Sequence, residues 1–508
     1  MRCKSYWSLS HWPVDWPATI ATFGLVKTIQ DELPQRIHLV GIGGAGLSGA
    51  ARILCERGRR ISGSDRAASD FSEALEDLDL TVTVGSTRPP LADDVELVVR
   101  SSAVPLEDTD CAAALARGLP VWKYAQLLGC MTPAGRTLAV AGTHGKTSVT
   151  WMLAHALGGL EAQLGPTAPA SGFLVGGLDC KLKTNARSEE PGGWFAVEAC
   201  EYDRSFLQLH PQGAIVTNIE ADHLDYYGTL DKIHESFGRF VDRVHPQGLV
   251  VVGEDVPDRV VAASRARVWR LGRELRVELT GEERGCFRFR LLGPGWATPE
   301  VQLTQPGRFQ VDNAALALAL VVGLAAPAWS LEPAAAARAA ASGLDQFRGV
   351  RRRFEKWGSD HGVEVIHDYA HHPTEVRVTL EAARRALPGL PLHVLFQPHQ
   401  HSRTARFMAE FVESLRGADR VIVADVYGAR VHIDQHGAGA DELVQRLGRA
   451  GIPALAGGDL QSSVHQAARA LPGGCALLVL GAGDIDTIRY DLFLELALRR
   501  APQRTSGA

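Results

Sequence analysis

The sequence lacks the features that mark secreted, membrane-bound or nucleic-acid-binding proteins. Its eight cysteines include no Cys-x-x-Cys pair, which argues against a zinc knuckle and a disulfide framework and favours a reducing, cytoplasmic location. The formal charge of −5 provides no electrostatic footprint for nucleic acid. No segment approaches the roughly 18 uninterrupted apolar residues of a membrane helix. We therefore expect no nucleic acid and no membrane as partner, and a monomer or weak homodimer.

The 508 residues are too many for one hydrophobic core, and the 45% apolar content is that of a globular protein. We expect three α/β domains, spanning residues 36 to 134, 135 to 345 and 346 to 508. Residues 1 to 35 carry three tryptophans between prolines but no continuous apolar run, so they do not resemble a signal peptide. We treat them as an extension of unknown role.

A phosphate-binding loop is indicated in the second domain. The apolar run from Thr137 breaks into Gly142-Thr-His-Gly-Lys-Thr147 and resumes as a helix. Backbone N–H groups of such a loop converge on phosphate oxygens at a helix N-terminus. Lys146 would meet the β- and γ-phosphates and the Thr147 hydroxyl a magnesium ion. Val140 stands where the common motif has glycine, so the loop is a short variant.

A second glycine loop follows the strand predicted at residues 36 to 40. Gly41, Gly43 and Gly46 precede a helix, and the next strand ends on Asp65. This order is typical of a dinucleotide-binding fold, in which the glycines admit a pyrophosphate and the acid bonds a ribose hydroxyl. The alternative is a turn that only packs a helix on a strand. Another strand ends in Ser101 and Ser102, which would join this site or cap a helix.

Two strands downstream of the phosphate loop end in acids. Glu198 and Glu201 follow the strand near residue 195, and Asp222 and His223 follow the strand near residue 215. Strands beside a phosphate loop commonly present oxygen and imidazole ligands to Mg²⁺. Helix capping by the acids and simple packing of the histidine are the alternatives. Their joint occurrence favours a metal site.

The third domain alternates predicted strands and helices, with strands at residues 363 to 366, 392 to 396, 421 to 424 and 476 to 480. Polar clusters follow these strands, among them Asp368-Tyr-Ala-His-His-Pro-Thr374 and Gln397-Pro-His-Gln-His-Ser-Arg403. Because carboxyl ends of parallel strands share one edge, a second substrate would bind there. Three arginines at residues 351 to 353 mark the junction, from which they would reach bound phosphates.

The chain resembles the Mur ligases of peptidoglycan synthesis, most closely their alanine-adding branch. The resemblance lies in Gly41-Ile-Gly-Gly-Ala-Gly46, Ala141-Gly-Thr-His-Gly-Lys-Thr147, Thr217-Asn-Ile-Glu-Ala-Asp-His-Leu-Asp225, Arg352-Arg-Phe-Glu355, Asp368-Tyr-Ala-His-His-Pro-Thr-Glu375, Phe396-Gln-Pro-His399 and Gly481-Ala-Gly-Asp484. It implies a Rossmann-like UDP-sugar domain, a central phosphate-loop ATPase domain and a Rossmann-like C-terminal domain. The implied reaction joins L-alanine to the carboxylate of UDP-N-acetylmuramate through an acyl phosphate, using ATP and Mg²⁺.

The resemblance also assigns residues to roles. Catalysis would fall to Lys146, His223 and Arg353. The metal ligands would be Thr147, Glu201 and His223, and the amino acid would be held by His372 and Arg403. ATP would contact Gly142, Thr143, His144, Gly145, Lys146, Thr147, Ser148, Asn313 and Arg353. The UDP-sugar would contact Gly41, Gly43, Gly44, Ala45, Gly46, Asp65, Ser101 and Ser102.

The chain departs from the family pattern at a few positions. Phe309 and Gln310 replace a His-Asn pair in the adenine-binding stretch, and Gln400 replaces an arginine that helps to hold the incoming carboxylate. Arg406 is a possible substitute for that arginine. Three other functions stay open: a sister ligase that adds a recycled peptide, an NAD-dependent oxidoreductase and a non-catalytic nucleotide-binding regulator.

Overall fold

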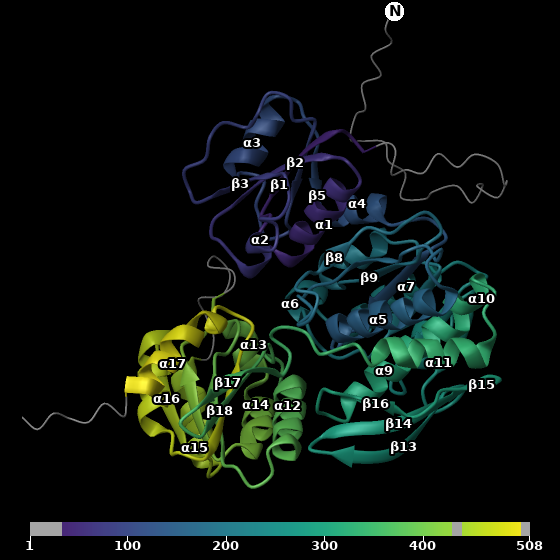
Figure 1. Cartoon of the computed structure of the whole chain (residues 1–508). Helices are drawn as coiled ribbons and strands as arrows, with labels where there is room; N and C mark the ends of the chain where they lie inside the picture. Colours follow the sequence, from purple (N-terminus) through teal and green to yellow (C-terminus); the bar gives the residue numbers. More distant parts are fainter. Residues whose placement is uncertain (1–32, 429–438, 499–508) are drawn as a thin grey trace, which may run out of the picture.

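The computed structural model describes residues 33–428 and 439–498, which form three α/β parts around separate, mainly parallel sheets (Figure 1). The predicted extension at residues 1 to 35 therefore lies almost wholly outside the described residues. Buried strands followed by amphipathic helices produce parallel sheets, because each crossover must return over the sheet. The predicted α/β fold class is confirmed.

The N-terminal sheet has the strand order β3-β2-β1-β4-β5, and all its pairs are parallel. Its strands are β1 (Arg36–Val40), β2 (Arg60–Asp65), β3 (Thr81–Val84), β4 (Leu97–Arg100) and β5 (Val121–Lys123). Its helices are α1 (Ala45–Glu56), α2 (Asp70–Glu73), α3 (Thr109–Ala116) and α4 (Tyr124–Met131). Since β1, β2 and β4 are neighbours, the glycine loop, Asp65 and Ser101 lie at one edge of the sheet.

The central sheet has the order β12-β11-β10-β6-β9-β7-β8, with β8 alone antiparallel among these strands. Its strands are β6 (Thr137–Ala141), β7 (Gly172–Leu174), β8 (Ala186–Arg187), β9 (Phe195–Glu198), β10 (Gly213–Val216), β11 (Leu249–Val252) and β12 (Arg267–Arg270). The helices of this part are α5 (Lys146–Leu164), α6 (Leu224–Tyr227), α7 (Leu230–Asp242), α8 (Asp258–Val261), α9 (Phe309–Leu320), α10 (Ala326–Ala328) and α11 (Pro333–Leu344). Because β6 lies between β9 and β10, the acids after those strands flank the phosphate loop.

A small antiparallel sheet, which we had not predicted, packs beside the central part. Its strands are β13 (Arg276–Glu283), β14 (Cys286–Gly293), β15 (Trp296–Ala297) and β16 (Val301–Gln302). Alternate residues of β14, namely Phe287, Phe289 and Leu291, are buried and join the core formed by α5, α9 and α11. The other face of the sheet is exposed, which is typical of antiparallel sheets.

The C-terminal sheet has the order β17-β18-β22-β19-β20-β21, with β17 antiparallel to β18. Its strands are β17 (Glu355–Asp360), β18 (Val363–Asp368), β19 (Leu392–Phe396), β20 (Arg420–Ala424), β21 (Ala454–Gly458) and β22 (Cys475–Leu480). Its helices are α12 (Pro373–Ala386), α13 (His401–Arg406), α14 (Met408–Ser414), α15 (Ala440–Arg449), α16 (Leu460–Ala470) and α17 (Arg489–Leu498). The four strands predicted here are present at the expected positions.

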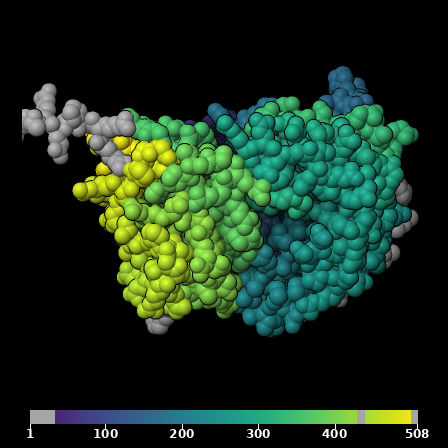
Figure 2. Space-filling view, turned by 90° about the horizontal axis from the view of Figure 1, so that it is seen from below, coloured from purple at the N-terminus to yellow at the C-terminus, as the bar shows by residue number. Residues whose placement is uncertain are grey.

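The three parts contact one another through polar bonds at their edges. The Asn185 amide donates to the Ala45 carbonyl oxygen at 2.7 Å, and Arg57 pairs with Glu189 at 2.7 Å, so α1 is fastened to the region around β8. The C-terminal part lies beside the central part, and the surface is hollowed where they meet (Figure 2). The carboxyl edges of the central and C-terminal sheets face each other across this junction.

One helical stretch is more apolar than we expected from the sequence, where no segment approached the apolar length of a membrane helix. The stretch Phe309–Ala328 is long and apolar enough to cross a membrane by length and composition, and 83% of its most apolar window is buried inside the protein. Its side chains pack in the core of the central part, against α5 and α11. The apolar character of this stretch is therefore used in tertiary packing.

Candidate active site

The phosphate loop joins β6 to α5 through two glycines that no other residue could replace without distortion. Gly142 has φ +143°, and a Cβ there would lie 1.9 Å from the hydroxyl oxygen of Thr217. Gly145 has φ +84° and precedes the first residue of α5. These values favour glycine because side chains crowd the backbone at positive φ. The close approach of the loop to Thr217 fixes its position beside β10.

The N-terminus of α5, which follows the loop, is suited to bind an anion. The amide N–H groups of Thr143 and His144 are used by Asn218, through its backbone and side-chain oxygens at 2.9 and 2.8 Å. Among the described residues no side chain caps α5, so the N–H groups of its first turn, from Lys146 to Ser148, are not taken up by a cap. Such groups, together with the helix dipole, bind phosphate.

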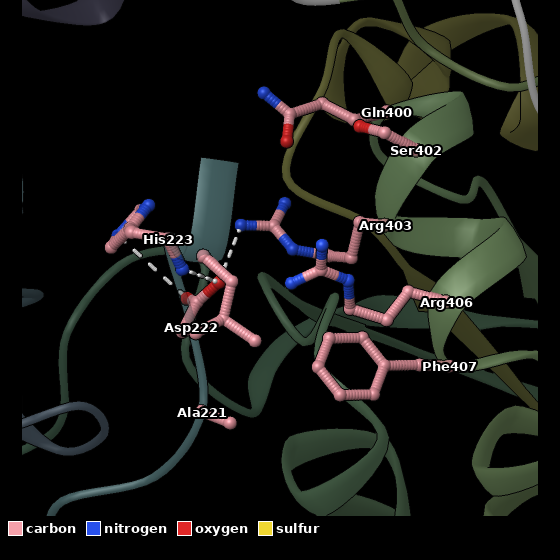
Figure 3. A pocket seen from close by; sticks show the side chains of 9 residues that line it. Ala221, Asp222, His223, Gln400, Ser402, Arg403, Arg406 and Phe407 are labelled. Carbon is pink, nitrogen blue, oxygen red and sulfur yellow. Dashed lines mark hydrogen bonds and ion pairs between the residues drawn. The ribbon is translucent and has the colours of Figure 1, made fainter. Parts of the chain in front are cut away.

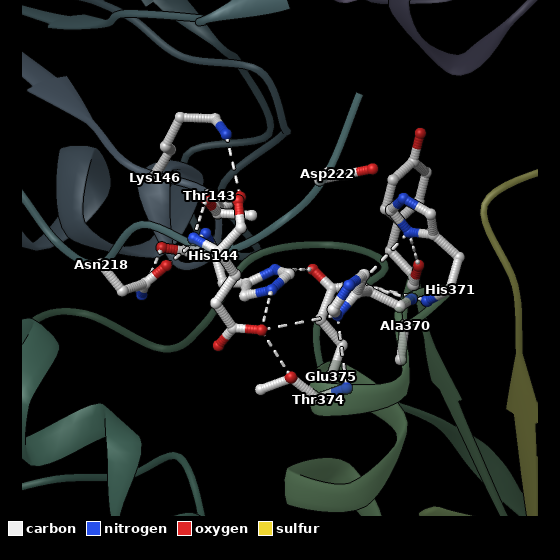
Figure 4. A network of polar contacts seen from close by, with 12 residues as sticks. Thr143, His144, Lys146, Asn218, Asp222, Ala370, His371, Thr374 and Glu375 are labelled. Carbon is white, nitrogen blue, oxygen red and sulfur yellow. Dashed lines mark hydrogen bonds and ion pairs between the residues drawn. The ribbon is translucent and has the colours of Figure 1, made fainter. Parts of the chain in front are cut away.

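Lys146 folds back over the loop (Figure 4). Its Nζ donates to the carbonyl oxygens of Gly142 and Thr143 at 2.6 and 3.0 Å and lies 2.9 Å from Oε2 of Glu201. Burial by itself would lower the pKa of Lys146, but the Glu201 carboxylate outweighs burial and raises it. The lysine is therefore a permanent cation at the mouth of the loop.

The acids after β9 and β10 fall into two groups. The Thr147 hydroxyl donates to Oε1 of Glu198 at 3.1 Å, and the other oxygen of Glu198 accepts from the Gly176 amide at 2.7 Å. Glu201 instead lies with Lys146 and with His223, whose Nε2 is 3.8 Å from Oε1 of Glu201. Of the metal ligands that the resemblance implies, Glu201 and His223 therefore lie together, whereas Thr147 contacts a different carboxylate, that of Glu198.

Left-handed backbone brings His223 into this group. His223 has φ +51°, and Asp203 and Arg204, which follow Glu201, have φ +53° and +54°. Residues other than glycine rarely adopt this conformation, and such positions cluster at functional sites. Burial lowers the pKa of His223, despite the opposing effect of Asp222, so its imidazole is neutral at physiological pH. A neutral imidazole beside two carboxylates has the chemistry of a metal ligand.

Arg403 and Asp222 form a buried ion pair across the junction, with Nη2 of Arg403 2.8 Å from Oδ1 of Asp222. Burial would raise the pKa of Asp222, but the Arg403 cation outweighs burial and holds it well below its usual range. The pair borders a cavity of about 40 Å³ (Figure 3). The lining residues are Ala221, Asp222, His223, Leu224, Gln400, Ser402, Arg403, Arg406 and Phe407.

His372 and Arg403, assigned together to the amino acid, line different cavities. His372 borders an open groove of about 510 Å³ between the central and C-terminal parts, which also contains Glu220 and Thr374. The ring of Phe407, 5.0 Å from that of His372, borders both cavities. The structure therefore places Arg403 at the small cavity and His372 beside the phosphate loop.

The central and C-terminal parts also meet at the phosphate loop itself. Nδ1 of His144 lies 3.1 Å from Oε1 of Glu375 at the start of α12 (Figure 4). Burial would lower the pKa of His144, but Glu375 and Glu220 outweigh burial and raise it to about 9. Arg353 approaches the same Glu375 oxygen at 3.9 Å and stacks on the Tyr369 ring at 5.0 Å. The arginine predicted to contact phosphate thus lies near the loop.

Asn313 of α9 also lies at the loop. Its side-chain oxygen is 2.9 Å from the point that a Cβ on Gly145 would occupy, and its amide nitrogen donates to Gln310 at 3.2 Å. Asn313 and Gln310 are both buried. The structure thus brings the predicted adenine-binding asparagine next to the phosphate loop, held by the glutamine that departs from the family pattern.

The carboxylate at the end of β2 holds the glycine loop of the N-terminal part in place. The Gly43 amide donates to Oδ2 of Asp65 at 2.8 Å. Gly41 has φ +86° and packs on Ser101, whose hydroxyl accepts from the Ala103 amide at 3.3 Å, while Ser102 is exposed. A Cβ on Gly46 would lie 2.7 Å from the Tyr124 ring. Gly44 and Ala45 form the N-cap and first residue of α1.

Three models of known families match this chain in succession. The Mur ligase family catalytic domain matches residues 36–135, the Mur ligase middle domain residues 140–321 and the Mur ligase glutamate ligase domain residues 352–483. The chain belongs to the Mur ligase family. The matches cover the phosphate loop, the acids after β9 and β10, and the C-terminal residues that face them.

Several relatives of this Mur ligase have the same name. The UDP-N-acetylmuramate–L-alanine ligase of Saccharopolyspora erythraea is 38% identical over 491 residues, which cover 94% of this chain and 95% of the relative. The enzyme of the same name from Kineococcus radiotolerans is 39% identical, over 91% of this chain and 97% of its own. The crystal structure of the UDP-N-acetylmuramate-alanine ligase from Thermotoga maritima has the same fold, with a TM-score of 0.72, 24% identity, and coverage of 92% of this chain and 100% of that chain.

Proposed function

We propose that this Mur ligase joins the amine of L-alanine to the carboxylate of UDP-N-acetylmuramate, with cleavage of ATP to ADP and phosphate. Names of relatives that match almost the full chain support the two substrates. The observation that carries the proposal is the position of the residues after β10. Asp222 borders the small cavity with Arg403, and the adjacent His223 contacts Glu201, the partner of Lys146. An amino acid in the cavity would therefore lie close to a transferred phosphate.

The residues present fit ATP and Mg²⁺. Positive-φ glycines and the uncapped start of α5 suit a triphosphate, and Lys146 supplies a fixed cation. Thr147 with Glu198, and Glu201 with His223, offer the oxygen and imidazole ligands that hold Mg²⁺ beside phosphates. Bound Mg²⁺ would neutralise the charge on the phosphates. Arg353 would add a second cation once Glu375 releases it.

The reaction that these residues support has two steps. The lactyl carboxylate attacks the γ-phosphorus of ATP, so an acyl phosphate forms and ADP leaves. The neutral amine of alanine then attacks the acyl carbon, phosphate leaves with the bonding electrons, and the amine loses a proton. Lys146 stabilises the charge that moves onto the transferred phosphoryl group, and Arg403 orients the alanine carboxylate at the cavity.

Sequence identity to the relatives favours a single amino acid over a peptide as the amine substrate. The alternative substrate is the tripeptide that a murein peptide ligase attaches, and such a ligase from Psychrobacter arcticus has a similar fold, with a TM-score of 0.68, 22% identity, and coverage of 91% of this chain and 99% of that chain. Relatives at 38–39% identity over almost the full chain have the alanine-ligase name, whereas the peptide ligase is 22% identical. We therefore favour alanine.

We also propose the domain limits 36 to 134, 135 to 345 and 346 to 508, which the separate sheets support. The N-terminal glycine loop would hold the UDP-sugar, with Asp65 maintaining the loop through Gly43. A cytoplasmic location fits cysteines that form no disulfide among the described residues.

The deciding experiment measures phosphate release with ATP, Mg²⁺ and UDP-N-acetylmuramate while the amine substrate is varied. We expect alanine to stimulate release more than glycine or serine and far more than the tripeptide. Stimulation by the tripeptide equal to that by alanine would refute the assignment. Turnover that depends on a nicotinamide cofactor, without alanine-dependent phosphate release, would indicate the oxidoreductase instead.

A further inference from the structure

A cluster of metal-ligating side chains spans the junction between the phosphate loop and the C-terminal part. It consists of His144 of the loop, Glu220 after β10 and His372 before α12. One potential ligand atom from each lies within 4.8 Å of the others. None of the roles assigned above requires these three side chains to meet. Figure 4 shows His144 facing the start of α12.

The distances within the cluster approach those of a metal site. Oε2 of Glu220 lies 3.5 Å from Nε2 of His144 and 3.8 Å from Nδ1 of His372. Ligands at the usual zinc distances, in tetrahedral geometry, are separated by roughly 3.4 Å. The two imidazole rings lie 4.8 Å apart, centroid to centroid. The widest separation among the three ligand atoms is at most 4.8 Å, so a shift of His372 by roughly 1 Å would bring all three ligands to one ion.

One ring nitrogen of the cluster, Nε2 of His144, is buried without a hydrogen-bond partner among the described residues. A buried polar atom without a partner costs roughly 1–3 kcal/mol, so this nitrogen calls for an additional ligand. In His372, which is only 5% exposed, the nitrogen that faces Glu220 is Nδ1, which accepts a hydrogen bond from the Thr374 amide at 3.3 Å. A bound ion would take the place of that amide at Nδ1.

Neighbouring side chains orient the potential ligands through polar contacts, as is common around metal ions in proteins. Nδ1 of His144 faces the Glu375 carboxylate at 3.1 Å, which leaves Nε2 directed at Glu220. Oε2 of Glu220 accepts a hydrogen bond from the Thr374 hydroxyl at 2.7 Å. Metal-ligating histidines commonly bond a carboxylate through their other ring nitrogen, which orients the ring. The cluster therefore has an outer shell as well as potential ligands.

We propose that His144, Glu220 and His372 bind a transition-metal ion of the Zn²⁺ class and thereby lock the C-terminal part against the phosphate loop. Two imidazoles and one carboxylate suit Zn²⁺, whereas Mg²⁺ is held mainly by oxygen ligands. The ion replaces the proton that His144 shares with the two neighbouring carboxylates. Because His144 belongs to the phosphate loop, the bound ion inhibits the reaction by fixing the loop in contact with α12.

The test is the binding of Co²⁺, a spectroscopic substitute for Zn²⁺, to the metal-free full-length protein. We expect one equivalent to bind, with the visible absorption of a low-coordinate site, and Zn²⁺ to displace it. His372→Asn, which retains a helix-capping side chain, and Glu220→Gln should each weaken binding at least about tenfold. His371→Asn changes the neighbouring histidine, which lies outside the cluster, and should bind as the unmodified protein does.

Melting temperatures measured with Zn²⁺ and a cysteine variant serve as controls for the binding experiment. Zn²⁺ should raise the melting temperature of the unmodified protein and of His371→Asn but not that of the two cluster variants. Cys200→Ser should retain the Co²⁺ absorption, which excludes a contribution from this exposed thiol next to Glu201. Absence of the absorption, or its persistence in both cluster variants, would overturn the proposal. Since binding is measured without turnover, failure here would leave the proposed ligase function untouched.

Discussion

The amine of Lys146 lies 2.9 Å from the Glu201 carboxylate and donates to two carbonyl oxygens of its own loop, so these three oxygens surround the cation. We expect phosphate oxygens to replace these contacts when nucleotide binds. Glu201 would then be released toward His223, 3.8 Å away. This ion pair would link nucleotide binding to the assembly of the candidate metal site.

Replacing this lysine tests its role directly. Lys146→Ala should reduce alanine-dependent phosphate release by at least about 1,000-fold, because the lysine stabilises the charge that moves onto the transferred phosphoryl group. Lys232→Ala, on the exposed face of α7, should leave the rate unchanged. Substantial turnover in Lys146→Ala would refute the role of the lysine.

Two adjacent glycines of α5 should respond to alanine in opposite directions. A Cβ on Gly158 meets no atom within 4 Å, whereas one on Gly159 would lie 2.0 Å from the Ala339 carbonyl oxygen of α11. Gly158→Ala should therefore stabilise the protein by about 0.5–1 kcal/mol through helix propensity. Gly159→Ala should destabilise it by about 3 kcal/mol, because α5 and α11 must separate.

Thermal unfolding of the two variants under identical conditions measures this contrast. The melting temperature should rise slightly for Gly158→Ala and fall by several degrees for Gly159→Ala. Equal melting temperatures would show that the two helices are not in the close contact described.

The strands that we predicted in the parallel sheets are mostly short apolar runs bounded by turn residues, and their order along the chain implied parallel sheets. The antiparallel sheet around β14 was not predicted. Its residues alternate between buried and exposed, with Leu279 of β13 50% exposed, so the strands lack continuous apolar runs. Short strands such as β8 depend on tertiary pairing and carry no sequence signal of their own.

The candidate site was predicted in composition but not in pairing. The sequence places Glu198, Glu201 and His223 after neighbouring strands, which is enough to expect them near the phosphate loop. His223, which meets Glu201, and Asp203, two residues after Glu201, both have left-handed backbone, and no local motif predicts that conformation for these residue types. The contact of His144 with Glu375 joins residues 231 positions apart, so it too required the structure.

A buried carboxylate in the N-terminal part gives stability that depends on pH. Asp110 of α3 accepts a hydrogen bond from Ser64 at 2.6 Å and pairs with Arg88 at 2.8 Å, and His38 lies 3.5 Å away. Burial would raise the pKa of Asp110, but its partners outweigh burial and hold it well below the usual 3.8. Asp110→Asn should cost about 2 kcal/mol at pH 7, because Arg88 loses one of its two anionic partners and keeps Asp108, 3.0 Å away.

The sign of the pH effect follows from the lowered pKa. In the unfolded chain Asp110 takes up a proton near pH 3.8, whereas in the folded chain it stays ionised to lower pH. Its stabilising contribution is therefore complete above pH 3.8 and is lost as the pH falls further. Unfolding of both proteins between pH 3 and 7 should show a gap that is constant at neutral pH and narrows at the acid end. A gap that is absent at pH 7 would contradict the ion pair.

Gln400 tests how the small cavity holds the amino acid. It borders the cavity with Arg403 and Arg406, and its backbone has φ +69° in the turn before α13. Arginine at this position faces the same backbone cost as glutamine, since neither is glycine.

Gln400→Arg would add a cation that hydrogen-bonds the alanine carboxylate, and a charged hydrogen bond is worth about 1.5–3 kcal/mol. We therefore expect the KM for alanine to fall by about tenfold or more, with kcat little changed, because the new bond forms equally with bound substrate and with the transition state. Gln400→Met, similar in length but uncharged, should not lower KM. An unchanged KM in Gln400→Arg would show that position 400 is remote from the carboxylate and that Arg403 binds it without help from this position.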